Sequence, residues 1–417
     1  MNKEGKKKIQ LKELYLVIFS IFFVFFLLAV IDRMIEIPLG SHLQKNIALI
    51  FPPHSQEEFV STDFHYKVVC NSVGIRDDRE VNIPKGKDIY RIVVLGDSYT
   101  YGWGVDIEDT WVRQLETLIK VNGKKVEILN LGKPGGDPLS YLQLAETAIP
   151  LLEPDLVLLA LLQGDDLLAT CGAFHANKQE NIIFTLLHCF YPNITQKVER
   201  YFVQKYLIKQ SEQIPPLSNS AEKNQESARN SAKEILAQLN EKEKERFNKL
   251  DNQIRSAFLD GLINPFLISV AIKYPDITVK PLEDSSNPAI APCIENLKRI
   301  LREIDMISKR SGAQIVLISV PQGFYVNRHA WENMKRLQFE VLPEMLTSHQ
   351  IDEHYILAGQ QIHLPCIVIT DEFRSRKEDP DLFFPIDGHP TPQGHRLLAE
   401  ALARQLQNWL DENINNH

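Results

Sequence analysis

The chain has 417 residues, 44% of them hydrophobic, and a formal net charge of −8 at pH 7. A chain of this length can bury a large hydrophobic core, but length alone does not fix the number of domains. General nucleic-acid binders contact phosphates through an excess of lysine and arginine, which this composition lacks, so we exclude that class of protein and expect no nucleic-acid partner.

An uncharged apolar segment occupies residues 14–31. At a helical rise of about 1.5 Å per residue its length roughly matches a bilayer core of about 30 Å, so it is a candidate transmembrane helix. A lysine-rich tail, residues 1–13, precedes it, whereas both acidic and basic residues follow it. This asymmetry predicts a cytoplasmic N-terminus and a periplasmic or otherwise extracytoplasmic remainder. A cleaved signal peptide is the alternative, but the run is long and no small-residue cleavage site follows it, so we predict a signal anchor.

The next segment, residues 32–88, has scattered turn signals and no strong helical period, which indicates a linker that packs on the body of the protein. The body, residues 89–417, begins with an apolar run at 91–95 that predicts a buried strand ending in a loop at Gly96. A helical pattern follows at 109–121.

Further apolar runs lie along the body, with helical patterns between several of them. This alternation predicts parallel strands covered by helices on both faces. A closing helix is expected over 391–410, with Thr391 as its N-cap and Pro392 in its first turn. The further predicted strands are 126–131, 155–162, 314–320 and 366–370.

An insertion at about 171–291 interrupts this alternation. Its middle, 220–259, is rich in Glu, Lys, Ala, Gln and Asn, with apolar residues at intervals, which is typical of a solvated helix or hairpin rather than a charged binding patch. Ligands usually bind at the carboxyl edge of a parallel sheet, so an insertion there could form a lid or a substrate rim.

The five cysteines are too widely spaced for a zinc site, and we expect no structural metal. An odd count leaves at least one cysteine unpaired within a monomer. If the body is exported, Cys171 and Cys189 could form a disulfide within one segment, but buried free thiols are an equal alternative.

A serine stands just past the first predicted strand of the body, in the glycine-rich segment 96–104. Ser98 can act as a nucleophile if a base removes its proton and N–H groups hold the developing oxyanion. The segment is not a GxSxG motif. Dinucleotide binding is excluded because GxGxxG is absent and no suitably placed acidic residue follows.

A carboxylate and an imidazole lie two residues apart before the closing helix. In an extended segment Asp387 and His389 would point to the same side, so Asp387 could accept from one ring nitrogen while the other takes the serine proton. His395 is the rival base, but it falls inside the predicted helix, where a structural or surface histidine is the commoner outcome.

Four separated blocks, in order across residues 91–410, resemble the motifs of the SGNH/GDSL hydrolase family. Residues 96–98 resemble its nucleophile block and residues 387–389 its acid and base block. Residues 130–136 resemble the second block, whose glycine donates an N–H to the oxyanion. Counting from Asn130, the glycine that donates to the oxyanion is Gly135, with Gly136 and Gly132 as alternatives.

The third block departs from the family pattern, because Asp165 replaces the asparagine whose amide donates to the oxyanion. An ionised carboxylate about 4 Å from the oxyanion would oppose it by roughly 4 kcal/mol at an effective dielectric near 20, and a lost donor costs about 10²- to 10³-fold in rate. A protonated Asp165 could still donate. Alternatively, the block is shifted by one residue, the protein is weakly active, or Asp165 and Asp166 form a helix N-cap pair.

The resemblance implies a three-layer α/β/α, flavodoxin-like fold and a serine esterase or acyl hydrolase that needs no metal or organic cofactor. Its oxyanion would be held by the N–H groups of Ser98 and Gly135, with Asp165 helping if neutral. Envelope-bound relatives add or remove O-acyl groups on surface polysaccharide, so the implied substrate is an acylated small molecule or glycan. A lipid esterase and a silent polysaccharide-binding module remain open.

Overall fold

A computed structural model of the chain describes residues 11–34, 46–171, 186–187, 189–211, 216–275 and 289–415. The chain divides into two compact units, one made of Met1–Ser41 and Ala176–Phe202, the other of His42–His175 and Val203–His417. The lysines of the predicted cytoplasmic tail at 3–8 lie outside the described residues. Each unit is described by itself below.

The larger unit is built on a five-stranded sheet whose strands are all parallel, in the order β4-β3-β5-β7-β8. The central strand β5 is buried along its whole length, and its continuous apolar run reflects the helices that cover both faces. The strands are β3 (Ile89–Gly96), β4 (Lys125–Gly132), β5 (Leu156–Leu162), β7 (Gln314–Val320) and β8 (Cys366–Val368).

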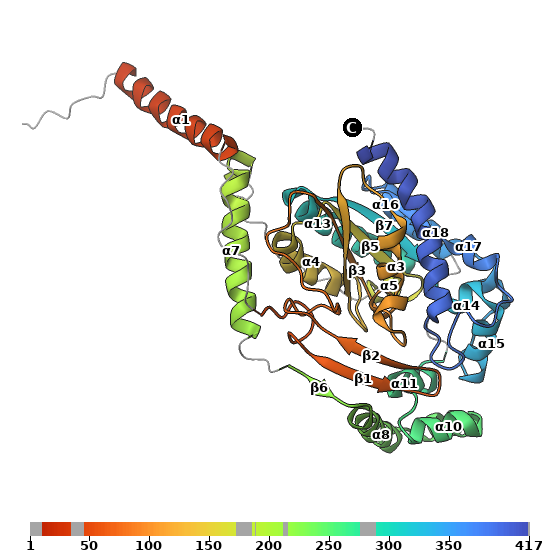
Figure 1. Ribbon diagram of the computed structural model, residues 1–417. Helices are drawn as coiled ribbons and strands as arrows, with labels where there is room; N and C mark the ends of the chain where they lie inside the picture. The colour runs from red at the N-terminus through yellow and green to blue at the C-terminus, as the bar shows by residue number, and fades with distance from the viewer. Residues whose placement is uncertain are drawn as a thin grey trace, which may run out of the picture. The chain divides into compact units, whose positions relative to one another are not determined.

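Helices cover both faces of this sheet (Figure 1). From β3 the chain moves outward to β4 on one side, and from β4 it crosses back past β3 to β5 on the other side. Right-handed crossovers that run in opposite directions along a sheet place their helices on opposite faces. The predicted three-layer α/β/α sandwich is therefore confirmed. One layer contains α4 (Pro138–Leu152), α13 (Ile290–Arg310) and α16 (Gln350–Gln360), and the other contains α3 (Trp111–Leu118) and α18 (Pro392–Leu410).

The closing helix α18 begins as the sequence predicts. The Thr391 side chain accepts a hydrogen bond from the Gly394 N–H, and Pro392 occupies the first turn, where its missing N–H is not needed. Shorter elements connect the body: α2 (Ser98–Tyr101), η1 (Ile107–Asp109), α5 (Asp165–Ala169), α14 (Gly323–Val326), α15 (Arg328–Arg336), η2 (Pro343–Leu346), α17 (Thr370–Arg374) and η3 (Asp411–Asn415).

The described part of the predicted linker contains a β-hairpin, which the sequence pattern did not indicate. Strands β1 (Gln56–Val60) and β2 (His65–Val69) pair antiparallel, and β6 (Ser218–Asn219) from the insertion pairs parallel to β1. Two segments far apart in the sequence therefore share one small sheet.

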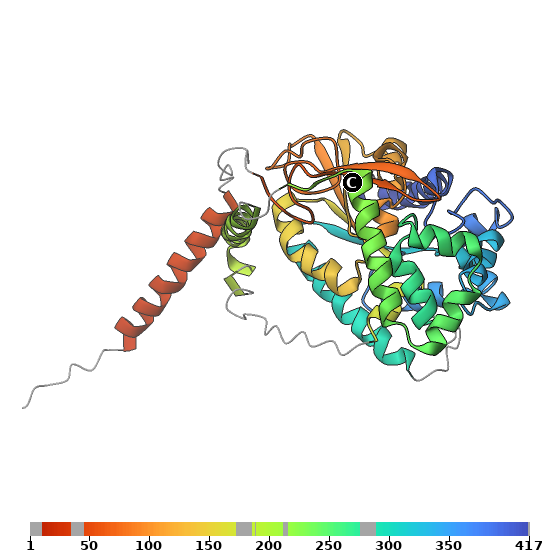
Figure 2. The same ribbon diagram turned by 90° about the horizontal axis from the view of Figure 1, so that it is seen from below.

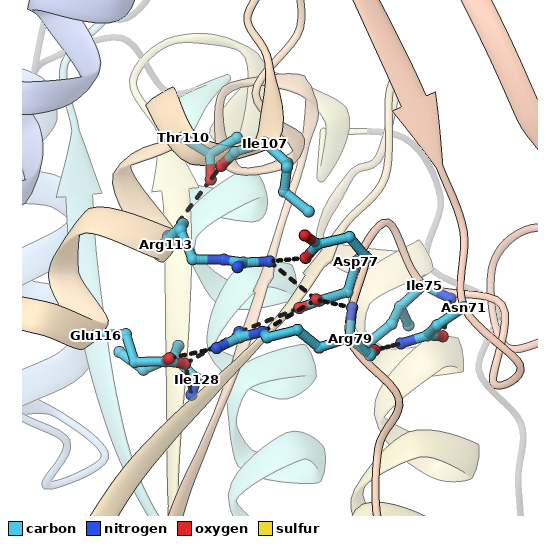
Figure 3. Close-up of polar contacts among 10 residues, drawn as sticks. Asn71, Ile75, Asp77, Arg79, Ile107, Thr110, Arg113, Glu116 and Ile128 are labelled. Carbon is cyan, nitrogen blue, oxygen red and sulfur yellow. Dashed lines mark hydrogen bonds and ion pairs between the residues drawn. The ribbon is translucent and has the colours of Figure 1, made fainter.

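Ion pairs fasten this N-terminal segment to the body (Figure 3). Arg79 donates to the buried Asp77 and, through Nη1, to Glu116 Oε1 of α3 at 2.6 Å. Arg113 of α3 donates to Asp77 Oδ1 at 2.9 Å. Glu116 also accepts the Ile128 N–H of β4, so the network joins the segment to a helix and a strand of the core.

Between residues 221 and 273 the insertion forms four helices of 8 to 18 residues instead of one long helix or hairpin. The helices break where polar residues begin a new helix: Asn240 forms a capping box with Glu243, and Asp251 accepts from the Ile254 N–H. They pack side by side, visible in green in Figure 2, around a second small core that also includes Leu337 and Phe339 of the body. They are α8 (Ala221–Gln238), α9 (Glu241–Lys249), α10 (Asn252–Leu259) and α11 (Pro265–Lys273).

A disulfide joins Cys171 to Cys293 of α13. The pairing of Cys171 with Cys189 considered above is therefore wrong, and Cys189 is a free, exposed cysteine. Proximity in sequence suggested that pair, whereas packing of α13 against α5 brings together cysteines 122 residues apart.

The smaller unit contains α1 (Leu11–Met34), and α7 (Pro192–Ser211) begins in it. Of the helices in the described part of the chain, α1 alone is long and apolar enough to cross a membrane, with a mean hydropathy of 3.1. A membrane anchor and a signal sequence both fit this helix. Its last turn contacts the start of α7, where Asp32 accepts the N–H groups of Asn193 and Ile194.

Candidate active site

Ser98 lies where β3 turns directly into the short helix α2. Asp97 is the N-cap of this helix and accepts the Tyr99 N–H at 2.9 Å. A side chain at Gly96 would meet Thr100 Oγ1 at 2.2 Å, so the turn requires glycine there. The order of strand, glycine, capping aspartate and serine thus presents a half-buried Ser98 at the carboxyl edge of the sheet.

The three residues predicted as a triad form a continuous hydrogen-bonded chain. His389 Nε2 lies 2.7 Å from Ser98 Oγ, although the two residues are 291 positions apart. His389 Nδ1 lies 2.5 Å from Asp387 Oδ1. With Asp387 as the acceptor, Nδ1 carries the ring proton and Nε2 is free to accept the serine proton.

The backbone around Asp387 and His389 differs from the extended segment that we expected. Gly388 has φ +83°, a left-handed conformation that favours glycine, and its N–H donates to the Phe384 carbonyl in a turn. The two side chains therefore meet across a turn, not along one side of a strand.

The charges around His389 favour its protonated form. Burial lowers its pKa, but Asp387, followed by Asp97 and Asp165, outweighs that effect, so the pKa of His389 is raised above its ordinary value. Burial also raises the pKa of Asp97 to about 7. A base with neighbouring carboxylates can hold a proton during a reaction and return it to a leaving group.

His395 lies in a different environment. It is fully buried in α18, and its Nδ1 accepts the Trp111 N–H of α3 at 3.3 Å. Burial lowers its pKa to about 3, so it is neutral at physiological pH. These contacts suit a structural histidine.

Gly135 is the third residue of a tight turn. The Gly136 N–H donates to the Lys133 carbonyl at 2.8 Å, and Gly135 has φ +69°, as expected for the glycine of a type II turn that follows Pro134. The Gly132 N–H donates to Asn130 Oδ1. Both alternative donors are thus already engaged, whereas no acceptor within the described residues contacts the Gly135 N–H.

Asp165 begins α5, just past the end of β5. Its Oδ2 accepts from Gln322 Nε2 at 3.3 Å. Part of the Asp165 residue is exposed to solvent. Loss of water around the carboxyl group raises its pKa to about 6, although the positive charge of His389 lowers it. At pH 7 Asp165 is therefore mostly ionised.

Asp166 is a buried structural residue. Its carboxylate accepts the Leu162 N–H at 2.8 Å and the Tyr141 hydroxyl at 3.1 Å. The N-cap of α5 is Gly164, without a side-chain hydrogen bond, so the interpretation of Asp165 and Asp166 as a capping pair is wrong.

Three further residues, none of them predicted from the sequence, contact the turn at residues 384–389, called the acid and base turn after the roles predicted for Asp387 and His389. Trp103 Nε1 donates to Asp387 Oδ2 at 3.3 Å, and the Tyr99 hydroxyl donates to the Gly388 carbonyl at 3.0 Å. Both lie in the glycine-rich segment 96–104, and their closeness to Ser98 in the sequence was a usable signal. Asp63, in the turn of the distant β1–β2 hairpin, accepts the Asp387 N–H, and no sequence motif marks it. No cluster of metal-binding side chains occurs among the residues that the structure describes.

No protein-family model matches the chain, and no curated protein matches it. Among solved structures, it is similar to a member of the lipolytic G-D-S-L family from Veillonella parvula, at 10% identity and a TM-score of 0.33 over 76% of this chain and 97% of that one. It is similar to a psychrotrophic esterase from Pseudoalteromonas at 10% identity and TM-score 0.34, over 77% and 99%. It is also similar to an acetylxylan esterase from Geobacillus stearothermophilus, at 11% identity and TM-score 0.33 over 76% and 94%. The chain is thus similar, at low identity, to solved structures of lipolytic and esterase proteins.

Proposed function

We propose that the chain is a serine esterase or acyl hydrolase whose catalytic residues are Ser98, His389 and Asp387. The observation that carries the proposal is the hydrogen-bonded chain from Asp387 through His389 to Ser98 Oγ. Each of the three groups has the partner that its role requires, in the order of a serine hydrolase triad.

The reaction would proceed through an acyl-enzyme. Ser98 Oγ attacks the ester carbonyl carbon while His389 Nε2 takes the hydroxyl proton, and Asp387 stabilises the resulting imidazolium. The N–H groups of Ser98 and Gly135 are the proposed oxyanion donors. His389 then gives its proton to the leaving alkoxide as the carbonyl re-forms. Water, activated by His389, releases the acid, or another hydroxyl accepts the acyl group.

Asp165 would make this reaction depend on pH. As a carboxylic acid it can donate to the oxyanion, whereas as a carboxylate it opposes the negative charge. A pKa of about 6 places the change inside the physiological range. His389 must be neutral to accept the serine proton, so the base requires higher pH while Asp165 favours lower pH.

We propose O-acyl groups, acetyl above all, on an envelope or exported polysaccharide as the substrate, with the body held on the extracytoplasmic side by α1. The motif resemblance and the apolar helix α1 support this assignment. A lipid esterase is the alternative, which a membrane tether also favours.

The test is labelling of the full chain, purified in detergent, with a fluorophosphonate probe that reacts with activated serines. We expect labelling of the wild type and none of Ser98→Ala or His389→Ala. Ser256→Ala, which removes an exposed serine of α10, is the matched control and should label fully. A panel of acetylated glycans, short-chain esters and phospholipids then separates the substrate classes.

A second candidate is a silent module that binds polysaccharide, which the mostly ionised Asp165 favours. It predicts a folded wild type that does not react with the probe and binds glycan as well as Ser98→Ala does. Labelling that depends on both Ser98 and His389 would exclude it.

A further inference from the structure

The turn of the β1–β2 hairpin contacts the backbone of the acid and base turn. Asp63 Oδ2 accepts the Ile386 N–H and the Asp387 N–H, each at 2.7 Å. A single carboxylate oxygen thus holds two consecutive backbone groups, one of them belonging to the proposed triad acid. Hydrogen bonds to an ionised acceptor are roughly twice as strong as neutral ones.

Asp63 is itself held in place from both sides. Ser61 Oγ accepts the N–H groups of Asp63 and Phe64, which fixes the turn. The Thr62 N–H donates to the Leu262 carbonyl of the insertion at 2.9 Å. The turn is therefore braced against the insertion on one side and contacts the acid and base turn on the other.

Aromatic packing reinforces this arrangement. Phe64 packs edge-on against Phe384, with ring centroids 5.2 Å apart, and against Trp103, at 6.4 Å. Trp103 Nε1 donates to the other carboxylate oxygen of Asp387. The hairpin therefore constrains both the backbone and the side chain of Asp387.

An acid so close to Asp387 is otherwise unfavourable. Burial, and further the negative charge of Asp387, raise the pKa of Asp63, while the two backbone N–H groups lower it. The Asp63 carboxylate can lie beside Asp387 because it accepts the N–H groups of Ile386 and Asp387, which favour its ionised form.

We propose that Asp63 is a positioning residue for the proposed reaction, which orients Asp387 toward His389 by holding the Ile386 and Asp387 N–H groups. This inference rests on the proposed function. It adds a residue from outside the four motif blocks and gives the N-terminal hairpin, braced by the insertion, a part in keeping the triad aligned.

The test compares Asp63→Ala and Asp63→Asn in the full chain in detergent, with the rate of fluorophosphonate labelling measured from pH 5 to 9. Displacing a catalytic group by about 1 Å can cost about 100-fold in rate, so we expect Asp63→Ala to label roughly 10- to 100-fold more slowly. Asn keeps an acceptor oxygen, and Asp63→Asn should recover most of the rate.

A pH profile separates positioning from a general loss of structure. The carboxylates that face His389 are Asp387, Asp97 and Asp165. If Asp387 turns away in Asp63→Ala, His389 loses the carboxylate that most favours its charged form. Its pKa then falls, and the acid limb of the profile moves to lower pH. Asp63→Asn should keep the wild-type midpoint.

Asp106→Asn is the matched control, because Asp106 also accepts a backbone N–H of the hairpin, from Lys67 at 3.0 Å, without contacting the acid and base turn. It should match the wild type. An Asp63→Ala protein that labels at the wild-type rate with an unchanged acid limb overturns the inference alone. If Asp63→Ala does not fold, Asp63→Ser takes its place, because its side chain is polar but too short to reach both N–H groups. Slower labelling of Asp63→Ser with a shifted acid limb supports the inference, and the wild-type rate with an unchanged limb overturns it. A wild type that fails to label overturns the proposed function and this inference together.

Discussion

At the residue scale, the least expected feature is a carboxylate in the third motif block. Asp165 favours the charged form of His389, the proposed base, yet in its ionised form it would oppose an oxyanion. Burial raises the pKa of Asp165 to about 6, so the proposed role as a donor to the oxyanion requires a pH below neutral.

Asp165→Asn tests this balance directly. With a pKa of about 6, Asp165 is mostly ionised at pH 8, whereas an asparagine amide can donate at every pH. One oxyanion donor contributes about 10²- to 10³-fold in rate. We therefore expect the variant to hydrolyse a short-chain ester up to about 100-fold faster than the wild type at pH 8, with an advantage that shrinks as the pH falls through 6. Esterase rates from pH 5 to 8 measure it. A slower variant at every pH would mean that the ionised carboxylate contributes to the reaction.

At the element scale, the strands of the main sheet and the closing helix followed from sequence pattern, whereas the short connecting helices and the hairpin of the N-terminal segment did not. The strand β7 has the predicted bounds, 314–320, and β5 differs from prediction by one residue. Continuous apolar runs mark strands that are buried on both faces. The hairpin strands have only five residues each; those of β1 are mostly half-buried and those of β2 alternate between exposed and buried, so their sequences carry little signal.

The ion-pair network that holds this segment to α3 should contribute to stability. Arg79→Ala removes the guanidinium that pairs with Asp77, whose side chain is only 5% exposed, and with Glu116. Because Arg79 is partly exposed and Asp77 keeps Arg113, we expect the free energy of unfolding to fall by about 1–2 kcal/mol, measured by urea denaturation.

Arg328→Ala is the control for that measurement. The pair Arg328–Glu378 is long, at 3.6 Å, with side chains 60% and 58% exposed, and such pairs contribute about 0–1 kcal/mol. Equal losses in the two variants would contradict a specific role for the network.

At the scale of the whole molecule, the Cys171–Cys293 disulfide closes a loop that contains the insertion. A cross-link between distant residues reduces the conformational entropy of the unfolded chain, and such bonds typically contribute about 2–4 kcal/mol. A disulfide also suits an exported domain, in agreement with the proposed topology.

The double variant Cys171→Ala, Cys293→Ala should therefore unfold with a free energy lower by about 2–4 kcal/mol. Reductant should destabilise the wild type and leave the double variant unchanged, as followed by urea denaturation. Cys189→Ala, which changes a free and exposed cysteine, should behave like the wild type in both conditions. A wild type that is insensitive to reductant would argue against the cross-link.

The fold class, the closing helix and the residue types of the candidate site could be predicted from the amino-acid sequence. These follow from local patterns: apolar runs, the N-cap residue of the closing helix, and the motif blocks around Ser98 and His389. Only the tertiary structure decided which distant groups meet. The contacts of Ser98 with His389, of Asp63 with the Asp387 turn, and of Cys171 with Cys293 span 291, 324 and 122 residues. Local patterns cannot specify such pairs, because the order of the strands and the packing of the insertion bring them together.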